Sequence, residues 1–302
     1  MPELAIDVRG LRKSYGSLEA VKGIDLHVNK GEVFSLLGPN GAGKTSTVEI
    51  LEGHRPRTAG DVSVLGHDPG KGERAFKSRI GIVLQETGVE RFLTVAEAID
   101  RFRGFYPSPR PLDEIIEVVG LQEKRNERVR KLSGGQQRRL DVAIGLAGDP
   151  ELLFLDEPTT GFDPSARRNA WEMIMNLKDL GKTVFLTTHY MDEAQQLADR
   201  VAIIVDGRIV AEGPPGQLVG AEVTSTRIEF RVPPDTQIPP EIAGSATRSG
   251  DELVFQSADP LPLLHAITGW SMETDVAIEG LTVAQPSLED VYLKLTAPKD
   301  DA

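Results

Sequence analysis

A glycine-rich segment that ends in Lys and Thr carries the residue types that bind phosphate groups. It fits the pattern G-x-x-x-x-G-K-[ST] and consists of Gly38, Pro39, Asn40, Gly41, Ala42, Gly43, Lys44 and Thr45. Glycines allow the backbone to curl so that successive N–H groups point at phosphate oxygens, and the helix that follows adds its positive N-terminus. Lys44 can then reach the β- and γ-phosphates of a nucleotide, while the Thr45 hydroxyl can bind Mg²⁺.

Two acidic residues follow the apolar run Leu152–Leu155, and both could serve the same phosphate site. A carboxylate at the end of a buried strand, here Asp156, can hold the metal ion through its water shell. Because side chains alternate along a strand, we expect Glu157 to face away from Asp156. That placement suits a general base that polarises a water molecule in line with the γ-phosphate.

A second element that could bind an anion lies upstream, in the sequence LSGGQ at residues 132–136. Ser133 and Gln136 have the spacing of a capping box, and Gly134 and Gly135 leave backbone N–H groups open at a helix start. Taken alone, this string also fits an ordinary helix cap. The chain thus contains two elements suited to binding phosphate, but only one of them is a glycine-rich loop of the type G-x-x-x-x-G-K-[ST].

Short apolar runs alternate with helix-like segments over the first 213 residues. The runs are typical of buried strands and comprise Glu32–Leu37, Ile80–Leu84, Leu152–Leu155, Thr183–Thr187 and Val201–Val205. Thr94 and Glu97 predict a capping box, Asp163 before Pro164 predicts a helix start, and Gly181 suits a helix C-terminus. This alternation predicts an α/β fold with a largely parallel central sheet.

The sequence changes character at residues 212–216, EGPPG, where Pro and Gly interrupt regular structure. We expect a nucleotide-binding domain at residues 1–213, a linker at 214–222 and a small C-terminal α+β domain at 223–302. The expected strands of this domain are Thr226–Val232, Glu252–Gln256 and Asp275–Val283, and its expected helices are Leu261–Thr268 and Ser287–Leu295, the last capped by Ser287 and Asp290. Residues 214–302 contain 14 acidic and 5 basic side chains, so this part is strongly acidic.

Composition limits the class of protein. The 302 residues suffice for about two domains, and the absence of Cys excludes disulfides and thiolate chemistry. The net charge of −12 argues against a general nucleic-acid binder, so no nucleic-acid partner is expected. The opening MPELAIDVRG has no signal-peptide pattern, and no apolar run approaches the ~18–20 residues of a transmembrane helix. We therefore expect a cytoplasmic chain that acts on a membrane only through another polypeptide.

The order of these motifs resembles that of ATP-binding cassette (ABC) proteins. LSGGQQRRL, upstream of LLFLDEP, is similar to the signature and Walker B motifs of that family. Tyr15 resembles the aromatic residue that stacks on adenine, Gln85 the Q-loop glutamine and His189 the switch histidine. The D-loop is matched by Gly161, Phe162 and Asp163, although Leu is more common in the family than Phe at the middle position.

The resemblance implies a P-loop NTPase core of the ABC ATPase type, with a helical subdomain at about residues 86–140. It also implies ATP and Mg²⁺ as cofactors. The catalytic residues would be Glu157, His189 and Gln85, and the metal would be held by Thr45, Gln85 and Asp156. ATP would contact Tyr15, Gly38, Pro39, Asn40, Gly41, Ala42, Gly43, Lys44, Thr45 and Ser46.

The family fold further implies a head-to-tail dimer, either a homodimer or a pseudo-dimer. The γ-phosphate held by Lys44 of one subunit would be closed in by residues of the other, namely Ser133, Gly134, Gly135 and Gln136. The dimer would work at the cytoplasmic face of the membrane on a separate integral-membrane permease, docked between residues 85 and 133. A basic set in this region fits contact with the permease or anionic headgroups, or a mostly solvated face with one or two members serving the dimer. It comprises Lys124, Arg125, Arg128, Arg130, Lys131, Arg138 and Arg139.

The tail of the chain points to one branch of the family. PSLEDVYLKLT at residues 286–296 resembles the C-terminal motif of drug-resistance exporters, which include daunorubicin-resistance-type ATPases. Residues 51–54 and 83–87 resemble the same branch. We therefore expect an ATPase that powers the export of drugs or other hydrophobic compounds, with lipid or polysaccharide as alternative cargo. A ribosome- or DNA-acting ABC ATPase is disfavoured, because the chain has one cassette and only 88 residues lie between Lys44 and Ser133.

Overall fold

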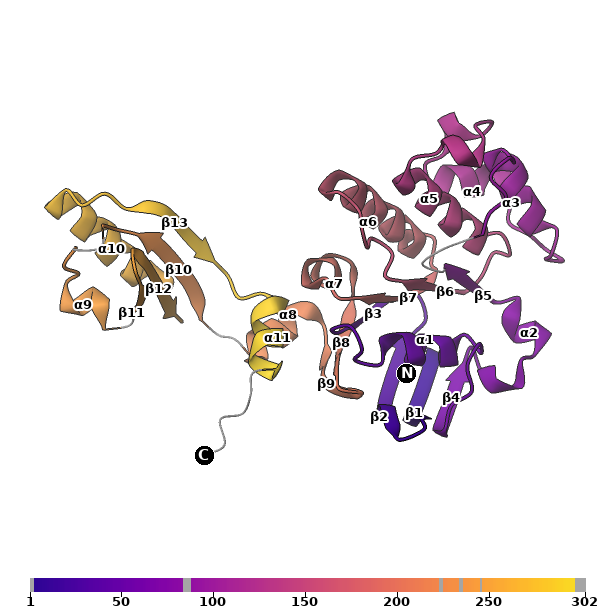
Figure 1. Cartoon of the computed structure of the whole chain (residues 1–302), viewed down its shortest axis with the longest axis horizontal. Coiled ribbons are helices and arrows are strands. Elements are labelled where there is room, and N and C mark those ends of the chain that lie inside the picture. Colours follow the sequence, from indigo (N-terminus) through magenta and orange to yellow (C-terminus); the bar gives the residue numbers. More distant parts are fainter. Residues whose placement is uncertain (1–2, 84–87, 223–224, 234–235, 245, 297–302) are drawn as a thin grey trace. The chain divides into compact units, whose positions relative to one another are not determined.

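The computed structural model describes residues 3–83, 88–222, 225–233, 236–244 and 246–296. The chain divides into two compact units, residues 1–215 and 216–302. The larger unit contains two sheets and most of the helices, and the smaller one contains a single sheet with its own helices (Figure 1). None of the described helices is both long and apolar enough to cross a membrane.

A six-stranded sheet forms the centre of the larger unit, in the order β5-β6-β7-β3-β8-β9. Its strands are β3 (Val33–Leu37), β5 (Ile80–Val83), β6 (Leu152–Asp156), β7 (Thr183–Thr188), β8 (Arg200–Val205) and β9 (Arg208–Gly213). All pairs are parallel except that of β8 with β9. The predicted parallel sheet is confirmed, because strands buried on both faces have nearly continuous apolar sequence.

The central sheet buries a different set of side chains on each face. Phe34, Phe154 and Phe185 lie on one face, where neighbouring ring centroids are 5.7 and 5.8 Å apart. They belong to the same apolar core as α1 (Lys44–Leu51). Leu153 and Val184 lie on the other face, in a second core to which several helices contribute. These helices include α5 (Gly134–Gly145), α6 (Pro164–Asp179) and α7 (Met191–Leu197), and Figure 1 shows α6 on the side of the sheet opposite α1.

A second, three-stranded antiparallel sheet covers the α1 side of the core. It consists of β1 (Leu4–Tyr15), β2 (Leu18–Asn29) and β4 (Ala59–Val64), in the order β2-β1-β4. Sequence analysis did not identify these strands. Their buried residues, such as Ile6 and Val8, alternate with polar ones, so they do not form the continuous apolar runs from which the central strands were predicted.

Helices extend the larger unit beyond the second face of the central sheet. They include α3 (Val95–Arg103), α4 (Leu112–Val118) and the start of α5, with the short α2 (Arg74–Lys77) on another edge. The predicted capping box of α3 is confirmed, since the Thr94 side chain accepts from the Glu97 N–H and the Glu97 carboxylate accepts from the Thr94 N–H. Asp163 caps α6 as predicted, and Gly181 follows that helix with a φ of 74°.

The smaller unit is an antiparallel sheet packed against one long helix. Its strands are β10 (Thr226–Arg231), β11 (Ala246–Ser249), β12 (Glu252–Ser257) and β13 (Glu279–Ala284), in the order β11-β12-β10-β13. Its helices are α8 (Pro215–Glu222), α9 (Pro240–Ala243), α10 (Pro260–Thr274) and α11 (Leu288–Thr296). Phe230 stacks on Phe255 at 5.5 Å, and α10 adds Ile267 and Trp270 to this core. The predicted Ser287–Asp290 cap of α11 is present.

The segment 214–222, expected to be a linker, contains the helix α8 from Pro215 onward, and proline is favoured at the first position of a helix. A strand was expected to begin at Asp275, but α10 runs on to Thr274 and Asp275 terminates it with a φ of 54°. The strand β13 therefore starts only at Glu279.

Glu52, which ends α1, is a carboxylic acid buried inside the larger unit. Its side chain is 3% exposed, and its Oε2 lies 3.2 Å from Nδ1 of His54. Burial raises the pKa of Glu52 from 4.5 to about 8, with the negative charges of Asp156 and Glu49 adding to the effect. The folded protein therefore holds a proton on Glu52 at a pH where the unfolded chain would release it.

Replacing Glu52 by Gln should remove a loss of stability that accompanies rising pH. Because the pKa of Glu52 is higher in the folded than in the unfolded state, the free energy of unfolding falls as pH rises between 4.5 and about 8. The slope from this group is at most about 1.4 kcal/mol per pH unit. We expect Glu52→Gln to gain stability relative to the wild type between about pH 6 and about pH 8, as measured by urea unfolding. This account would be contradicted if the free energy of unfolding differed between variant and wild type by the same amount at both pH values.

Candidate nucleotide-binding site

The glycine-rich loop lies between β3 and α1, at the carboxyl end of a central strand. Gly43 has a φ of 105°, and a Cβ at this position would lie 2.6 Å from the carbonyl oxygen of Ala20. A Cβ on Gly38 would lie 2.3 Å from the carbonyl oxygen of Ile204. Only glycine allows the loop to pass this close to its neighbours while the N-terminus of α1 faces outward.

A pocket of about 390 Å³ opens over this loop. Its lining residues are Ala20, Asn40, Gly41, Gly43, Lys44, Thr45, Ser46, Asp156 and Glu157. The structure thus brings most of the predicted phosphate-binding residues together with the two predicted acids. Thr45 and Asp156 offer a hydroxyl and a carboxylate oxygen, ligands that suit Mg²⁺ when phosphates and waters complete its shell. Among the described residues, no three of His, Cys, Asp or Glu gather to hold a metal by themselves.

Lys44 is nearly buried, with 5% of its surface exposed. Its Nζ donates hydrogen bonds to the carbonyl oxygens of Gly38 (2.8 Å) and Pro39 (3.2 Å). The same Nζ lies 3.4 Å from Oε1 of Glu157. The ammonium group is therefore held over the loop at the N-terminus of α1, where it can contact the outer phosphates of a nucleotide.

Asp156 and Glu157 lie at the end of β6, and both line the pocket of Lys44. The expectation that strand alternation turns Glu157 away from Asp156 was wrong. The strand ends at Asp156, and Glu157 adopts the left-handed region with a φ of 44°. For a residue other than Gly this costs about 1–3 kcal/mol and persists only where the surroundings impose it. Here the Glu157 N–H donates to the carbonyl oxygen (3.2 Å) and hydroxyl (3.0 Å) of Thr187 on β7.

The Glu157 carboxylate is surrounded by groups that favour its charged form. Oε2 accepts a hydrogen bond from the Thr160 hydroxyl (3.1 Å) and lies 3.3 Å from Nδ1 of His189, a contact within ion-pair distance but without hydrogen-bond geometry. Burial raises the pKa of Glu157, but the Lys44 ammonium and the His189 ring outweigh this and hold the pKa below its usual value. Glu157 is therefore ionised and able to accept a proton.

Tyr15, the residue predicted to stack on adenine, is tied to the first turn of α1. Its hydroxyl lies 3.0 Å from the Ser46 hydroxyl. The Lys13 Nζ and the Arg55 guanidinium lie 4.9 and 5.3 Å from the centre of its ring. Tyr15 is 39% exposed, so it offers an accessible aromatic side chain beside the phosphate-binding helix.

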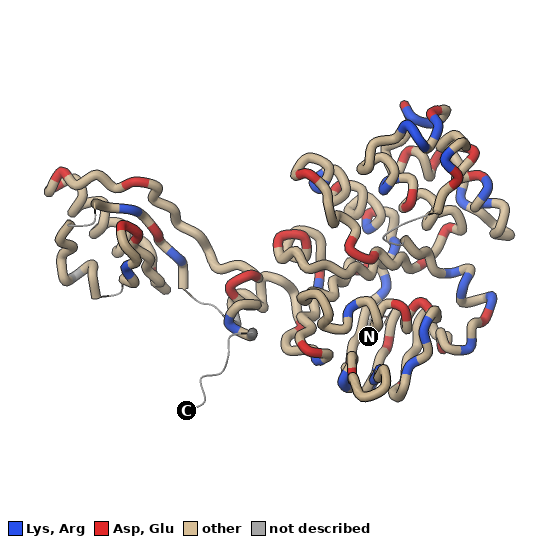
Figure 2. The backbone as a smooth tube through the Cα atoms, in the orientation of Figure 1, with Lys and Arg blue, Asp and Glu red and all other residues tan. Residues whose placement is uncertain are grey.

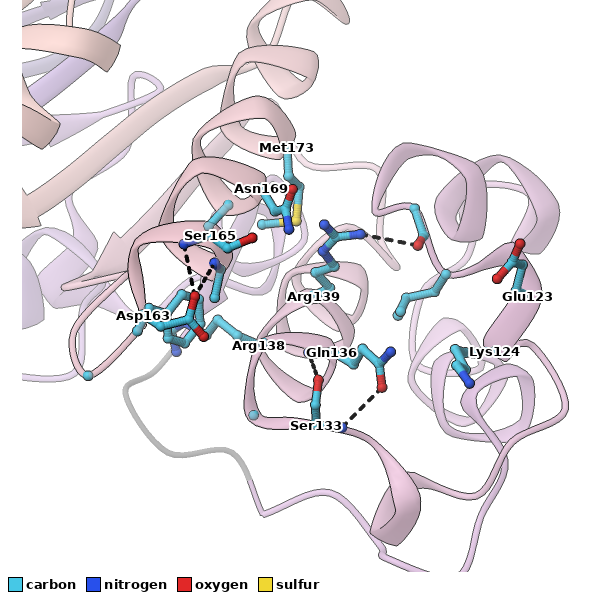
Figure 3. A pocket seen from close by; sticks show the side chains of 18 of the residues that line it. Glu123, Lys124, Ser133, Gln136, Arg138, Arg139, Asp163, Ser165, Asn169 and Met173 are labelled. Atoms are coloured by element: carbon cyan, nitrogen blue, oxygen red, sulfur yellow. Dashed lines mark hydrogen bonds between the residues drawn. The ribbon is translucent and has the colours of Figure 1, made fainter.

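The signature residues line a different pocket, of about 800 Å³. Ser133 caps α5 in the predicted capping box, with its hydroxyl accepting from the Gln136 N–H and its own N–H donating to the Gln136 side chain. Figure 3 shows Ser133 and Gln136 at the start of α5, in the same pocket as Asp163, which caps the start of α6. The predicted signature and D-loop residues meet there, since Ser133, Gly134, Gly135, Gln136, Gly161, Phe162 and Asp163 all line this pocket. Ser133 and Gln136 do not line the pocket of Lys44.

Gln85, predicted to bind the metal and to take part in catalysis, lies outside the described residues.

The basic set does not form one solvated face. Arg125 is ion-paired with Asp113, and Lys131 with Glu127. Arg138 is only 7% exposed, so its assignment to that surface was wrong. Figure 2 accordingly shows acidic segments beside the basic ones in the helical part of the larger unit.

Sequence reasoning missed several residues that shape the site. Thr187 fixes the backbone of Glu157 and also donates its hydroxyl to the Asp156 carboxylate. Glu193 on α7 is fully buried and accepts a hydrogen bond from the Thr159 hydroxyl (2.7 Å). An acidic residue on the buried face of a short helix was the available signal for Glu193. No sequence signal distinguishes Thr187 from the other residues of its strand.

Known proteins resemble this chain over nearly its whole length. The ABC transporter family profile matches residues 21–160. The Nod factor export ATP-binding protein I of Ralstonia nicotianae is 37% identical, over 96% of this chain and 93% of the relative. The daunorubicin/doxorubicin resistance ATP-binding protein DrrA of Streptomyces peucetius is 37% identical, over 99% of this chain and 95% of the relative.

Solved structures share the fold of the larger unit. CbiO1 from Clostridium perfringens, part of the ABC transporter complex CbiONQ, matches with a TM-score of 0.66 and 25% identity, over 72% of this chain and 91% of that protein. The dimeric cassette MJ0796 matches with a TM-score of 0.61 and 24% identity, over 69% and 98%. Together with the site geometry, these relationships show that the chain belongs to the ATP-hydrolysing, ATP-binding subunits of ABC transporters.

Proposed function

We propose that this chain hydrolyses Mg-ATP in a head-to-tail dimer and thereby drives a separate membrane permease that exports hydrophobic compounds. The observation that carries the dimer is the division of the site within one chain. Lys44, Thr45 and Asp156 line one pocket, whereas Ser133 and Gln136 line another. A helix N-terminus such as that of α5 binds an anion only when it faces one, so a second copy must supply the nucleotide.

In this scheme the residues of one pocket hold and activate the reactants. The N-terminus of α1 and Lys44 bind the phosphates, Tyr15 stacks on the adenine, and Glu157 accepts a proton from the attacking water. His189, 3.3 Å from Glu157, completes the polar surroundings of that water. Mg²⁺, held through Thr45, Asp156 and Gln85, would offset the negative charge of the phosphates. The capped start of α5 in the other copy would bind the γ-phosphate.

Export is supported by the full-length similarity to two export or resistance ATPases, which includes the smaller C-terminal unit. Their names specify different cargo, and this agrees with selection of the cargo by the permease. We infer that the chain works at the cytoplasmic face of the membrane, bound to that permease. Drugs are the proposed cargo class, with lipid or polysaccharide as the alternatives.

Replacing Glu157 by Gln should abolish ATP hydrolysis and transport while ATP binding persists. Loss of a general base lowers kcat by about 10²–10⁴-fold, whereas the phosphate contacts of Lys44 remain. The assay is ATP hydrolysis, together with ATP-dependent daunorubicin accumulation in everted vesicles that contain the chain and its partner permease. The matched control is Glu172→Gln on α6, an exposed carboxylate outside both pockets. If vesicles with the wild-type chain hydrolyse ATP but take up no daunorubicin, drug export is refuted while the ATPase role stands.

A mixture of two inactive variants should regain activity if the site is built from two chains. Lys44→Ala removes the phosphate contact and Ser133→Arg blocks the signature, so neither variant alone should hydrolyse ATP. In mixed dimers both changes fall in one site and the other site is intact, which restores up to about a quarter of wild-type activity. No gain on mixing, or full activity of Ser133→Arg alone, would argue against the shared site.

A further inference from the structure

The strained backbone of Glu157 is held on both sides by one buried arginine. Nη2 of Arg138 donates to the carbonyl oxygen of Asp156 (2.9 Å), the residue before Glu157. Nε of Arg138 donates to the carbonyl oxygen of Pro158 (3.2 Å), the residue after it. The residues before and after Glu157 are therefore tied to a single side chain through their carbonyl oxygens. Because the guanidinium group is planar and rigid, two such bonds fix orientation as well as position.

Arg138 belongs to α5, the helix that Ser133 caps. It thus connects the element predicted to bind the γ-phosphate of the second copy with the loop that carries the general base. Burial lowers the pKa of Arg138, while the nearby carboxylates of Asp141, Asp156 and Glu193 act in the opposite direction. The next residue behaves differently. Arg139 lies closer to the surface and donates to the Gly120 carbonyl oxygen (3.2 Å).

We propose that Arg138 is a positioning residue that sets the orientation of the Glu157 carboxylate and transmits movement of the signature helix to it. The proposal rests on the role of Glu157 as general base. A shift of α5 when the dimer closes would move both carbonyl oxygens together, and with them the intervening Glu157. Hydrolysis would then depend on the position of the signature helix, even though Arg138 does not line the pocket of Lys44.

The test compares Arg138→Gln and Arg138→Lys in the full-length chain. We expect Arg138→Gln to lower kcat by about 10–10²-fold, since a misplacement of about 1 Å in a reacting group has effects of this size. The Kd for ATP should change by less than about twofold, because the contacts of Lys44 and the α1 N-terminus are untouched. Arg138→Lys should recover part of kcat, because an ammonium group can still donate to one of the two carbonyl oxygens.

The matched control is Arg57→Gln in the larger unit. Arg57 also donates to a backbone carbonyl oxygen, that of Gly60 (2.9 Å), and pairs with Asp68. We expect Arg57→Gln to lower the urea midpoint without lowering kcat. If Arg138→Gln does not fold, Arg138→Lys decides the question, and it must lower kcat at unchanged Kd. The proposal would be overturned if the folded Arg138 variants had the kcat of the wild type, whether or not their affinity for ATP were weaker.

A double-mutant cycle separates positioning of Glu157 from a general structural role. In the Glu157→Gln background, Arg138→Gln should have little further effect on single-turnover hydrolysis, because its target is already removed. If Arg138→Gln lowers the single-turnover rate by the same factor in the Glu157→Gln background as in the wild type, the proposal is overturned. Full activity of Glu157→Gln would overturn the base assignment and the proposal with it. An inactive Glu157→Gln beside a fully active Arg138→Gln would overturn the proposal alone.

Discussion

Parallel pairing of β6, β7 and β3 places the carboxyl ends of three neighbouring strands on the same side of the central sheet, where the strands end. The glycine-rich loop and Lys44 follow β3, Asp156 and Glu157 end β6, and His189 follows β7. Lys44 and Glu157, 113 positions apart, and Glu157 and His189, 32 positions apart, thereby meet within ion-pair distance. Loops on this side are where ligands bind in open α/β sheets. Every step of the proposed chemistry depends on this arrangement.

The end of β6 shows how the sheet also sets the electrostatics. Glu157 leaves the strand in a left-handed conformation, which turns its carboxylate toward Lys44 instead of letting strand alternation continue. Two neighbours impose that conformation. Thr187 accepts from the Glu157 N–H, and Arg138 donates to the carbonyl oxygens on both sides. Strain at a site is maintained when its surroundings determine it from several directions.

The sequence predicted the features that are encoded locally. Continuous apolar runs marked the buried strands, and side-chain spacing marked the caps at Thr94, Ser133 and Asp163. Features that depend on tertiary context were not predicted. The strands β1, β2 and β4 alternate polar and apolar residues, and the helix α8 begins with a proline that also fits a break. The burial of Arg138 could not be predicted, because the groups that compensate its charge lie about 20 positions further along the chain.

The central claim, that two copies complete each ATP site, is tested most directly by light scattering of the Glu157→Gln variant with and without Mg-ATP. Because this variant binds ATP without consuming it, the account predicts a shift from monomer to dimer that requires ATP. The double variant Lys44→Ala, Glu157→Gln lacks the phosphate contact and should remain a monomer under the same conditions. A variant with ATP bound that stays monomeric, even with the permease present, would contradict the shared site.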